Sequence, residues 1–157
     1  MKELTTLVLT APLIVGTACS HDSSLIKHVN PPGLARPTGY THVVEAQGGR
    51  MLFVSGQVAR DQAGNLVGKG DFRAQTRQVF ENLKTALAGC GATLDDVAKI
   101  TIFVTDASEI QAFREVRDSY FTKTPPASSF FQVVRLAQPD LMVEVEAIAV
   151  TSSVATR

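Results

Sequence analysis

The sequence predicts an α+β fold in which two helices cover one face of a single mixed sheet. Two strand-like runs come first, two helical stretches alternate with strands in the middle, and two strands end the chain, in the order ββαβαββ. With 157 residues, of which 45% are hydrophobic, the chain is long enough to bury one core. We therefore expect one main domain.

Two strands are expected before the first helix. Residues 41–46 and 51–57 are both strand-like, and Gly48-Gly49 between them predicts the turn of a β-hairpin. The preceding residues 20–37 are rich in Ser, Pro and Gly, which is typical of a linker or an extended lead-in.

The first helix is predicted from its cap, its apolar stripe and its stop signal. Asp71 is placed to cap the N-terminus, and Gly89 and Gly91 end the helix. The apolar positions that share one face are Phe72, Val79, Leu83, Ala86, Leu87 and Cys90. We expect Cys90, at the end of this stripe, to be a small core residue rather than a nucleophile.

A strand, a helix and another strand are expected next. Residues 100–104 are β-branched and apolar, as in a strand covered on both faces. Ser108 and Gln111 form a capping box that opens the second helix. The apolar stripe of this helix consists of Ile110, Phe113, Val116 and Tyr120. Pro125-Pro126 ends the region, and residues 128–134 form the following strand.

The last strand, residues 141–150, carries two carboxylates in an apolar sequence. One face is formed by Val143, Val145, Ala147 and Ala149. Glu144 and Glu146 therefore share the other face with apolar residues. Covering such a Glu favours its neutral form and makes it a candidate proton carrier, and a solvated strand face is the alternative.

Two helices on one face leave the other face of the sheet bare, which predicts an oligomer. The chain has 15 Lys and Arg residues against 15 Asp and Glu residues, so its net charge is zero. Zero net charge favours self-association. Nucleic-acid binding is disfavoured, because it depends on neutralising phosphates and this chain has zero net charge and scattered basic residues.

Neither a metal nor a cofactor is expected. The chain has two cysteines, Cys19 and Cys90, which are too few for a disulfide framework. Its three histidines, His21, His28 and His42, all lie within the first 42 residues, and no cluster has metal-ligand spacing.

The first 19 residues have the order of an export signal. Lys2 precedes an apolar stretch over residues 4–15, and small residues lead to Cys19. The stretch is too short for a typical transmembrane helix. Cys19 also resembles a bacterial lipoprotein cleavage site, so the protein is expected to be periplasmic or anchored through a lipid on Cys19. The alternatives are an overextended start or a tail on a cytoplasmic protein.

Several short motifs along the chain resemble those of one family. They are Tyr40, Phe53-Val54-Ser55-Gly56-Gln57, Ala92-Thr93-Leu94-Asp95-Asp96-Val97, Ile102-Phe103-Val104-Thr105-Asp106, Pro126-Ala127 and Val143-Glu144-Val145-Glu146-Ala147-Ile148-Ala149. Together they resemble the Rid/YjgF family of reactive-intermediate deaminases over residues 29–150. The resemblance implies a chorismate-mutase-like homotrimer with small-ligand clefts between subunits. The domain would occupy residues 38–151, and residues 152–157 would be a tail.

The resemblance also implies an activity and a site. Relatives hydrolyse enamines and imines to carbonyl compounds and ammonia. By position, Glu144 would orient the attacking water, Tyr40 would close the pocket, and Ser55 and Gly56 would line it with backbone groups. Ribonuclease activity, described for some relatives, is disfavoured by the zero net charge, the few aromatic residues and the lack of paired histidines.

One departure from the family pattern affects the substrate. Ser128 stands where the deaminases have the Arg that binds the substrate carboxylate, and a hydroxyl supplies no charge. Hydrolysis of 2-iminopropanoate is therefore not expected. A different imine or enamine is one reading, and a non-catalytic ligand-binding trimer is the other.

Other residues near this position are candidate sources of charge or of contacts. Arg117 in the second helix could supply the cation, although an ordinary solvated helix arginine is the favoured reading. Arg135 is expected to face away, on the opposite side of the strand from Ser128. Phe130, if it faces the cleft, would favour an apolar or aromatic ligand.

Overall fold

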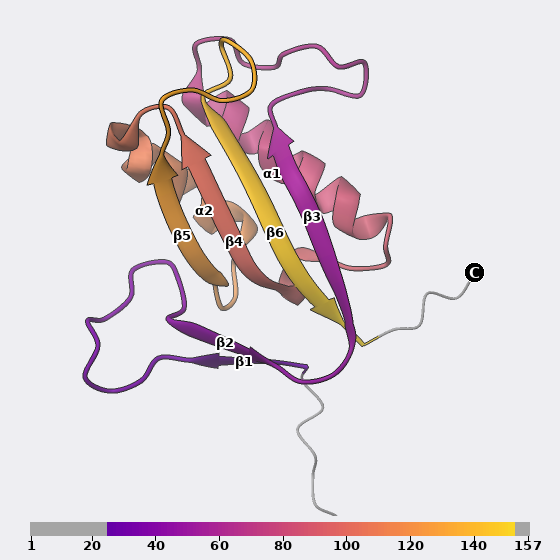
Figure 1. Ribbon diagram of the computed structural model, residues 1–157, viewed down its shortest axis with the longest axis vertical. Helices are drawn as coiled ribbons and strands as arrows, with labels where there is room; N and C mark the ends of the chain where they lie inside the picture. The colour runs from indigo at the N-terminus through magenta and orange to yellow at the C-terminus, as the bar shows by residue number, and fades with distance from the viewer. Residues whose placement is uncertain (1–24, 153–157) are drawn as a thin grey trace, which may run out of the picture.

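The computed structural model describes residues 25–152, in which a four-stranded sheet carries two helices on one face (Figure 1). The strands lie in the order β3 (Arg50–Val58), β6 (Val143–Thr151), β4 (Val97–Val104) and β5 (Ala127–Gln132). The central strand β6 is antiparallel to both β3 and β4, whereas β4 and β5 are parallel. The predicted mixed α+β sheet is confirmed. The export signal and Cys19 lie outside the described residues.

The two helices are α1 (Phe72–Ala88) and α2 (Ile110–Tyr120). Helix α2 connects the parallel strands β4 and β5, which need a crossover of this kind. Both helices lie behind the sheet in Figure 1, as the sequence predicts. Within residues 25–152, neither helix has the length and apolar character needed to cross a membrane.

The predicted hairpin between residues 41–46 and 51–57 is wrong. Strand β2 (Val43–Ala46) pairs instead with β1 (Ile26–Val29), which lies inside the expected lead-in of residues 20–37. Strand β3 pairs with β6 from the other end of the domain. Gly48 and Gly49 both have positive φ, so they do form a turn, but it leads the chain from one sheet to the other.

Helix α1 begins where the sequence predicts, but it ends before Cys90, which was expected to lie on its apolar face. The Asp71 carboxylate accepts a hydrogen bond from the backbone N–H of Ala74, which confirms the cap. The helix ends at Ala88, with Gly89 as its C-cap. Cys90 therefore falls in the turn after the helix, and its thiol is exposed rather than part of the core. The expectation of a core cysteine is wrong because the helical stripe stops before it.

The predicted capping box at Ser108 and Gln111 is also wrong. Asp106 takes the capping role, and its carboxylate accepts from the backbone N–H of Ser108 at 2.8 Å. A short 3-10 turn, η2 (Ala107–Glu109), then leads into α2. Because Asp106 already binds this N–H, the Ser108 side chain is not needed as a cap.

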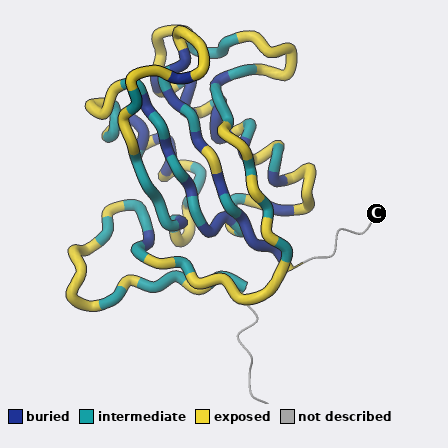
Figure 2. Tube along the Cα trace, viewed as in Figure 1, coloured by how far each residue is buried: buried dark blue, intermediate teal, exposed yellow. Residues whose placement is uncertain are grey.

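The core lies between the sheet and the helices. In β6, Val143, Val145, Ala147 and Ala149 are buried, which confirms the predicted face and fixes the register of the strand. Helix α1 contributes Val79, Phe80, Leu83 and Leu87, which are fully buried. Figure 2 shows that buried residues follow the central strands, while exposed residues lie in the loops and along the edge strand β3.

The other face of the sheet is uncovered in the single chain. Phe53 is 74% exposed and Phe131 is 51% exposed. Along β4, fully buried residues alternate with half-buried ones, so this strand is covered on one face and not on both as predicted. The apolar residues of the open face would be covered if copies of the chain associated.

Candidate functional site

Three of the predicted binding residues line one hollow beside α2. Tyr40 comes from the loop before β2, Arg117 from α2 and Ser128 from β5, and the hollow has a volume of about 160 Å³. Ser128 pairs in register with the buried Ile100, so it points to the helix side of the sheet. Complete small-molecule sites usually enclose ~300–1,000 Å³, so this hollow has the size of a partial site.

Arg117 is a buried helix residue with 4% of its surface exposed. Its Nε and Nη2 donate to Oδ1 of the exposed Asp118 at 2.9 and 2.7 Å. Gly39 makes room for it, because a side-chain carbon at that position would overlap the guanidinium. The expectation of an ordinary solvated helix arginine is therefore wrong, and the charge lies in the same hollow as Ser128.

The loop that carries Tyr40 is attached to the start of β5. The backbone N–H of Thr41 donates to the Pro126 carbonyl at 3.1 Å, and its hydroxyl donates to the Pro125 carbonyl at 2.5 Å. The Tyr40 ring packs edge-on against His42, with the ring centroids 5.2 Å apart. These contacts hold Tyr40 beside the hollow, which it lines.

One wall of the hollow is apolar. Phe113 from α2 and Phe130 from β5 pack against each other with ring centroids 5.5 Å apart, and Ile110 extends the wall. Phe130 thus faces the hollow, as a preference for an apolar or aromatic ligand would require. An apolar group of a ligand would contact these rings.

Sequence reasoning missed Arg114, which also lines this hollow. It precedes Arg117 by one helical turn, and that spacing could have identified the pair. No hydrogen bond or ion pair holds its guanidinium within residues 25–152. The described lining contains no Asp or Glu, so the hollow holds two arginines, of which Arg117 is paired with Asp118 from outside the lining.

Glu144 lies on the opposite face of the sheet, beside Gly56. It pairs in register with Phe103 of β4 and Val58 of β3. A side-chain carbon at Gly56 would overlap the Glu144 carboxylate. Gly56 is not among the glycines with positive φ, so it provides space rather than an unusual backbone conformation. The structure therefore brings Gly56 and Glu144 together.

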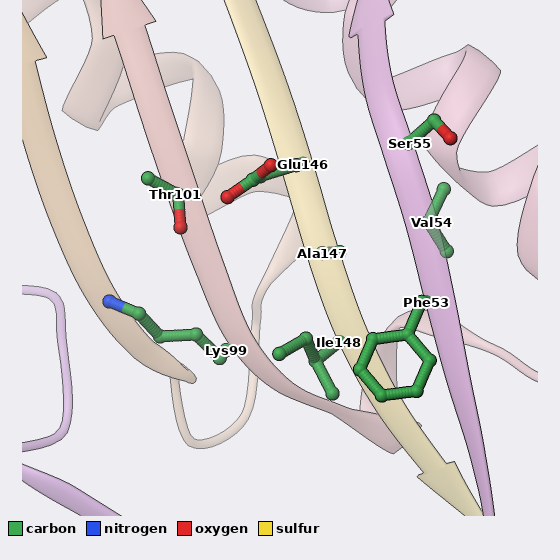
Figure 3. A pocket seen from close by; sticks show the side chains of 8 residues that line it. All are labelled: Phe53, Val54, Ser55, Lys99, Thr101, Glu146, Ala147 and Ile148. Atoms are coloured by element: carbon green, nitrogen blue, oxygen red, sulfur yellow. The ribbon is translucent and has the colours of Figure 1, made fainter.

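Ser55 faces a second hollow, of about 250 Å³, on the open face of the sheet (Figure 3). Lys99 and Glu146 line it, and Lys99 Nζ donates to the Ser129 hydroxyl at 2.6 Å. Burial lowers the pKa of the Lys99 ammonium, and the negative charge of Glu146 opposes that shift. Sequence reasoning missed Lys99, although its alternation with apolar residues in β4 places it on this face.

The predicted site residues thus fall on two faces of one sheet. Tyr40, Arg117 and Ser128 lie on the helix side, whereas Ser55, Gly56 and Glu144 lie at β3 and β6 on the open side. The backbone of the sheet separates the two groups, so one small ligand cannot contact both within a single chain.

One further residue lies elsewhere than expected. Strand β5 ends at Gln132, so Arg135 lies exposed in the following loop and not on the strand as predicted. In the part of the chain that the structure describes, no three His, Cys, Asp or Glu residues are grouped to hold a metal ion.

Comparison with known proteins identifies several relatives. The family model described as endoribonuclease L-PSP matches residues 33–151. A RutC family protein of Pyrococcus horikoshii is 38% identical over 115 residues, covering 73% of this chain and 89% of the relative. Protein DfrA of Myxococcus xanthus is 40% identical over 112 residues, covering 71% and 85%.

The fold also matches a solved structure. The crystal structure of YyfB, a Rid family protein of unknown function from Yersinia pestis, superimposes with a TM-score of 0.76 and 37% sequence identity. The match covers 81% of this chain and 99% of that protein. The resemblance drawn from the motifs is therefore confirmed at the level of both sequence and fold.

Proposed function

Because the chain belongs to the endoribonuclease L-PSP family, which is the Rid/YjgF family, we propose that it hydrolyses an imine or enamine in a cleft between two copies of the chain. Membership of this family supports a small-molecule deaminase-like or endoribonuclease-like protein. Zero net charge favours a small molecule over RNA, since RNA binding depends on neutralising phosphates.

The observation that carries the proposal is the separation of the site residues onto two faces. Arg117 and Ser128 on one copy would meet Glu144 and Gly56 of a second copy, so that each cleft contains both groups. A homotrimer would contain three such clefts. The exposed Phe53 and Phe131 on the open face support association, because burial against another copy would remove them from water.

In this reaction Glu144 acts as the proton carrier. Its carboxylate takes a proton from a water molecule as the oxygen forms a bond to the imine carbon, and it returns the proton to the nitrogen. The proton of the new hydroxyl group is then transferred to the nitrogen through the same carboxylate, and breaking of the C–N bond releases ammonia and leaves a carbonyl compound. The space at Gly56 allows the carboxylate to approach the strand backbone, whose groups would help to hold the water.

Arg117 lies in the same hollow as Ser128, so a carboxylate imine is a suitable test substrate although Ser128 itself supplies no charge. A direct test is to measure ammonia release from freshly generated 2-iminobutanoate by the wild type and by the Glu144→Gln variant. We expect the variant to lose turnover by about 100-fold or more, which is the usual contribution of general acid–base catalysis. Glu146→Gln is the matched control, because Glu146 lies on the same face of the same strand and lines the other hollow. Equal activity of the Glu144→Gln variant and the wild type would exclude the proposed role.

A non-catalytic trimer that binds a small ligand is the second candidate, and one observation favours it. Ser128 supplies no charge at the position where the deaminases bind the substrate carboxylate. Ligand binding by the wild type without ammonia release from any tested imine would support this second candidate.

A further inference from the structure

The charge in the hollow beside α2 is only partly neutralised. Asp118 engages Nε and Nη2 of Arg117, and Nη1 makes no hydrogen bond within residues 25–152. Nη1 is not fully buried, because within residues 25–152 only Arg50 Nε is a side-chain nitrogen or oxygen that is both buried and without a hydrogen bond. Of the five hollows described, Arg117 lines this one alone, so we infer that Nη1 faces it.

The ion pair does not by itself explain why Arg117 is buried. Removing a guanidinium from water is costly, and a solvent-exposed partner recovers little of that cost. Asp118 keeps 61% of its side chain exposed, whereas Arg117 keeps 5%. Arg117 cannot lose its charge to lower the cost. A bound anion in the hollow would supply the missing partner.

The surrounding residues complement this arrangement. Ser128 on β5 is small, so it leaves space in the hollow that a long side chain would fill. Arg114 adds a second, unpaired cation one turn earlier on α2. The rings of Phe113 and Phe130 provide an apolar surface next to both charges.

We propose that Arg117, assisted by Arg114, forms an anion-binding subsite on α2 in place of a cation on β5. The ligand of the hollow is a carboxylate with an apolar body, in which the carboxylate bonds to Arg117 and the body contacts Phe113 and Phe130. This inference rests on the proposed function only for the location of the site, because binding can be measured without turnover.

The test uses two unreactive probes that differ only in charge, 3-phenylpropanoate and 3-phenylpropanamide, with binding to the full chain measured by calorimetry. We expect the wild type to bind the carboxylate at least about tenfold more tightly than the amide. We expect Arg117→Gln to remove this preference and Arg117→Gln/Ser128→Arg to restore it, because the second change returns a cation to the hollow. Acetate should bind at least about tenfold more weakly than 3-phenylpropanoate, because it lacks the apolar body.

Two further variants separate ligand binding from a structural role. Asp118→Asn removes the negative charge that competes with the ligand for Arg117, while the amide oxygen can still accept its hydrogen bonds. Carboxylate affinity should therefore rise several-fold, and the substituted side chain is exposed enough for folding to be retained. Arg135→Gln removes an exposed arginine in a loop and serves as the matched control, with no change expected. If Arg117→Gln does not fold, Asp118→Asn decides: unchanged or weaker carboxylate binding overturns the inference.

Three other outcomes also overturn it. They are equal binding of the two probes, a carboxylate preference that survives in Arg117→Gln, and a lack of detectable binding of either probe. Failure of the proposed hydrolysis is distinguishable, because carboxylate preference without ammonia release would leave the subsite intact and exclude only the reaction.

Discussion

At the scale of single residues, Gly56 shows how a missing side chain can define a site. The Glu144 carboxylate occupies the position that a side chain at Gly56 would need. Gly39 has the same relation to Arg117 on the other side of the sheet. Arg117 and Glu144, both proposed to act on the ligand, are therefore each paired with a glycine that gives the side chain space.

Gly56→Ala should displace the Glu144 carboxylate and reduce kcat/KM for ammonia release by about tenfold or more, since small misplacements of a catalytic group cost up to about 100-fold. Gly89→Ala is the matched control, because that glycine has ordinary helical φ and space for a side-chain carbon. Kinetic and thermal-unfolding measurements on both variants check the prediction. A Gly56→Ala enzyme with wild-type kcat/KM would contradict it.

Lys99 predicts a pH dependence of stability. Burial lowers its pKa below the ordinary 10.5, so between the lowered pKa and 10.5 the unfolded chain binds more protons than the folded one. The free energy of unfolding contributed by this group therefore rises with pH in that range. A difference of one full proton between the two states would give a slope of ~1.4 kcal/mol per pH unit. The slope should stay below that value, because the ammonium is partly solvated and its pKa shift is correspondingly limited.

Lys99→Met should remove this contribution. Denaturant unfolding of both proteins at several alkaline pH values below 10.5 measures it. The variant should have the higher stability at neutral pH and the flatter pH dependence. Parallel curves for the two proteins would show that Lys99 is not responsible.

At the scale of elements, local signals predicted the helices and most strands, but they missed β1 and did not give every strand its partner. The spacing of apolar residues gave the helix faces, and alternation gave the buried face of β6. The pairing of β2 could not be predicted, because two glycines can close a hairpin or redirect the chain to another sheet. Strand β3 pairs with residues about a hundred positions later, and no local pattern reports such a contact.

The same limit applies to the site. The sequence named Tyr40, Arg117 and Ser128 separately, and the structure places all three in one hollow. Burial of Arg117 depends on the loop at Gly39, which is far from α2 in the sequence. A helical pattern alone therefore could not distinguish a buried arginine from a solvated one.

The correction at the start of α2 leads to a stability prediction. Asp106→Ala should lower the free energy of unfolding by roughly 0.5–2 kcal/mol, the usual cost of losing a cap. Ser108→Ala should cost less, because the Ser108 side chain does not cap the turn. Denaturant unfolding of the two variants checks this order. If Ser108→Ala lowers the free energy of unfolding more than Asp106→Ala does, Ser108 is the cap, as the sequence predicted.

At the scale of the whole molecule, the open sheet face and the divided site point to the same conclusion. A single chain has exposed aromatic residues on one side of its sheet and half of the proposed site on each side. Association of copies would cover the exposed aromatic residues and would bring the two halves of the site together. The proposed site is therefore a property of the assembly rather than of the chain.

Mixing two inactive variants, Arg117→Gln and Glu144→Gln, tests this claim most directly. The variants are unfolded together, refolded as mixed oligomers and assayed for ammonia release. Suppose that each site combines Arg117 from one copy with Glu144 from another. In an equal mixture, the first copy retains Arg117 with a probability of one half, and the second retains Glu144 with a probability of one half. About a quarter of the wild-type activity should then return. If mixed oligomers form and activity stays at the level of the separate variants, the site lies within one chain and the account is wrong.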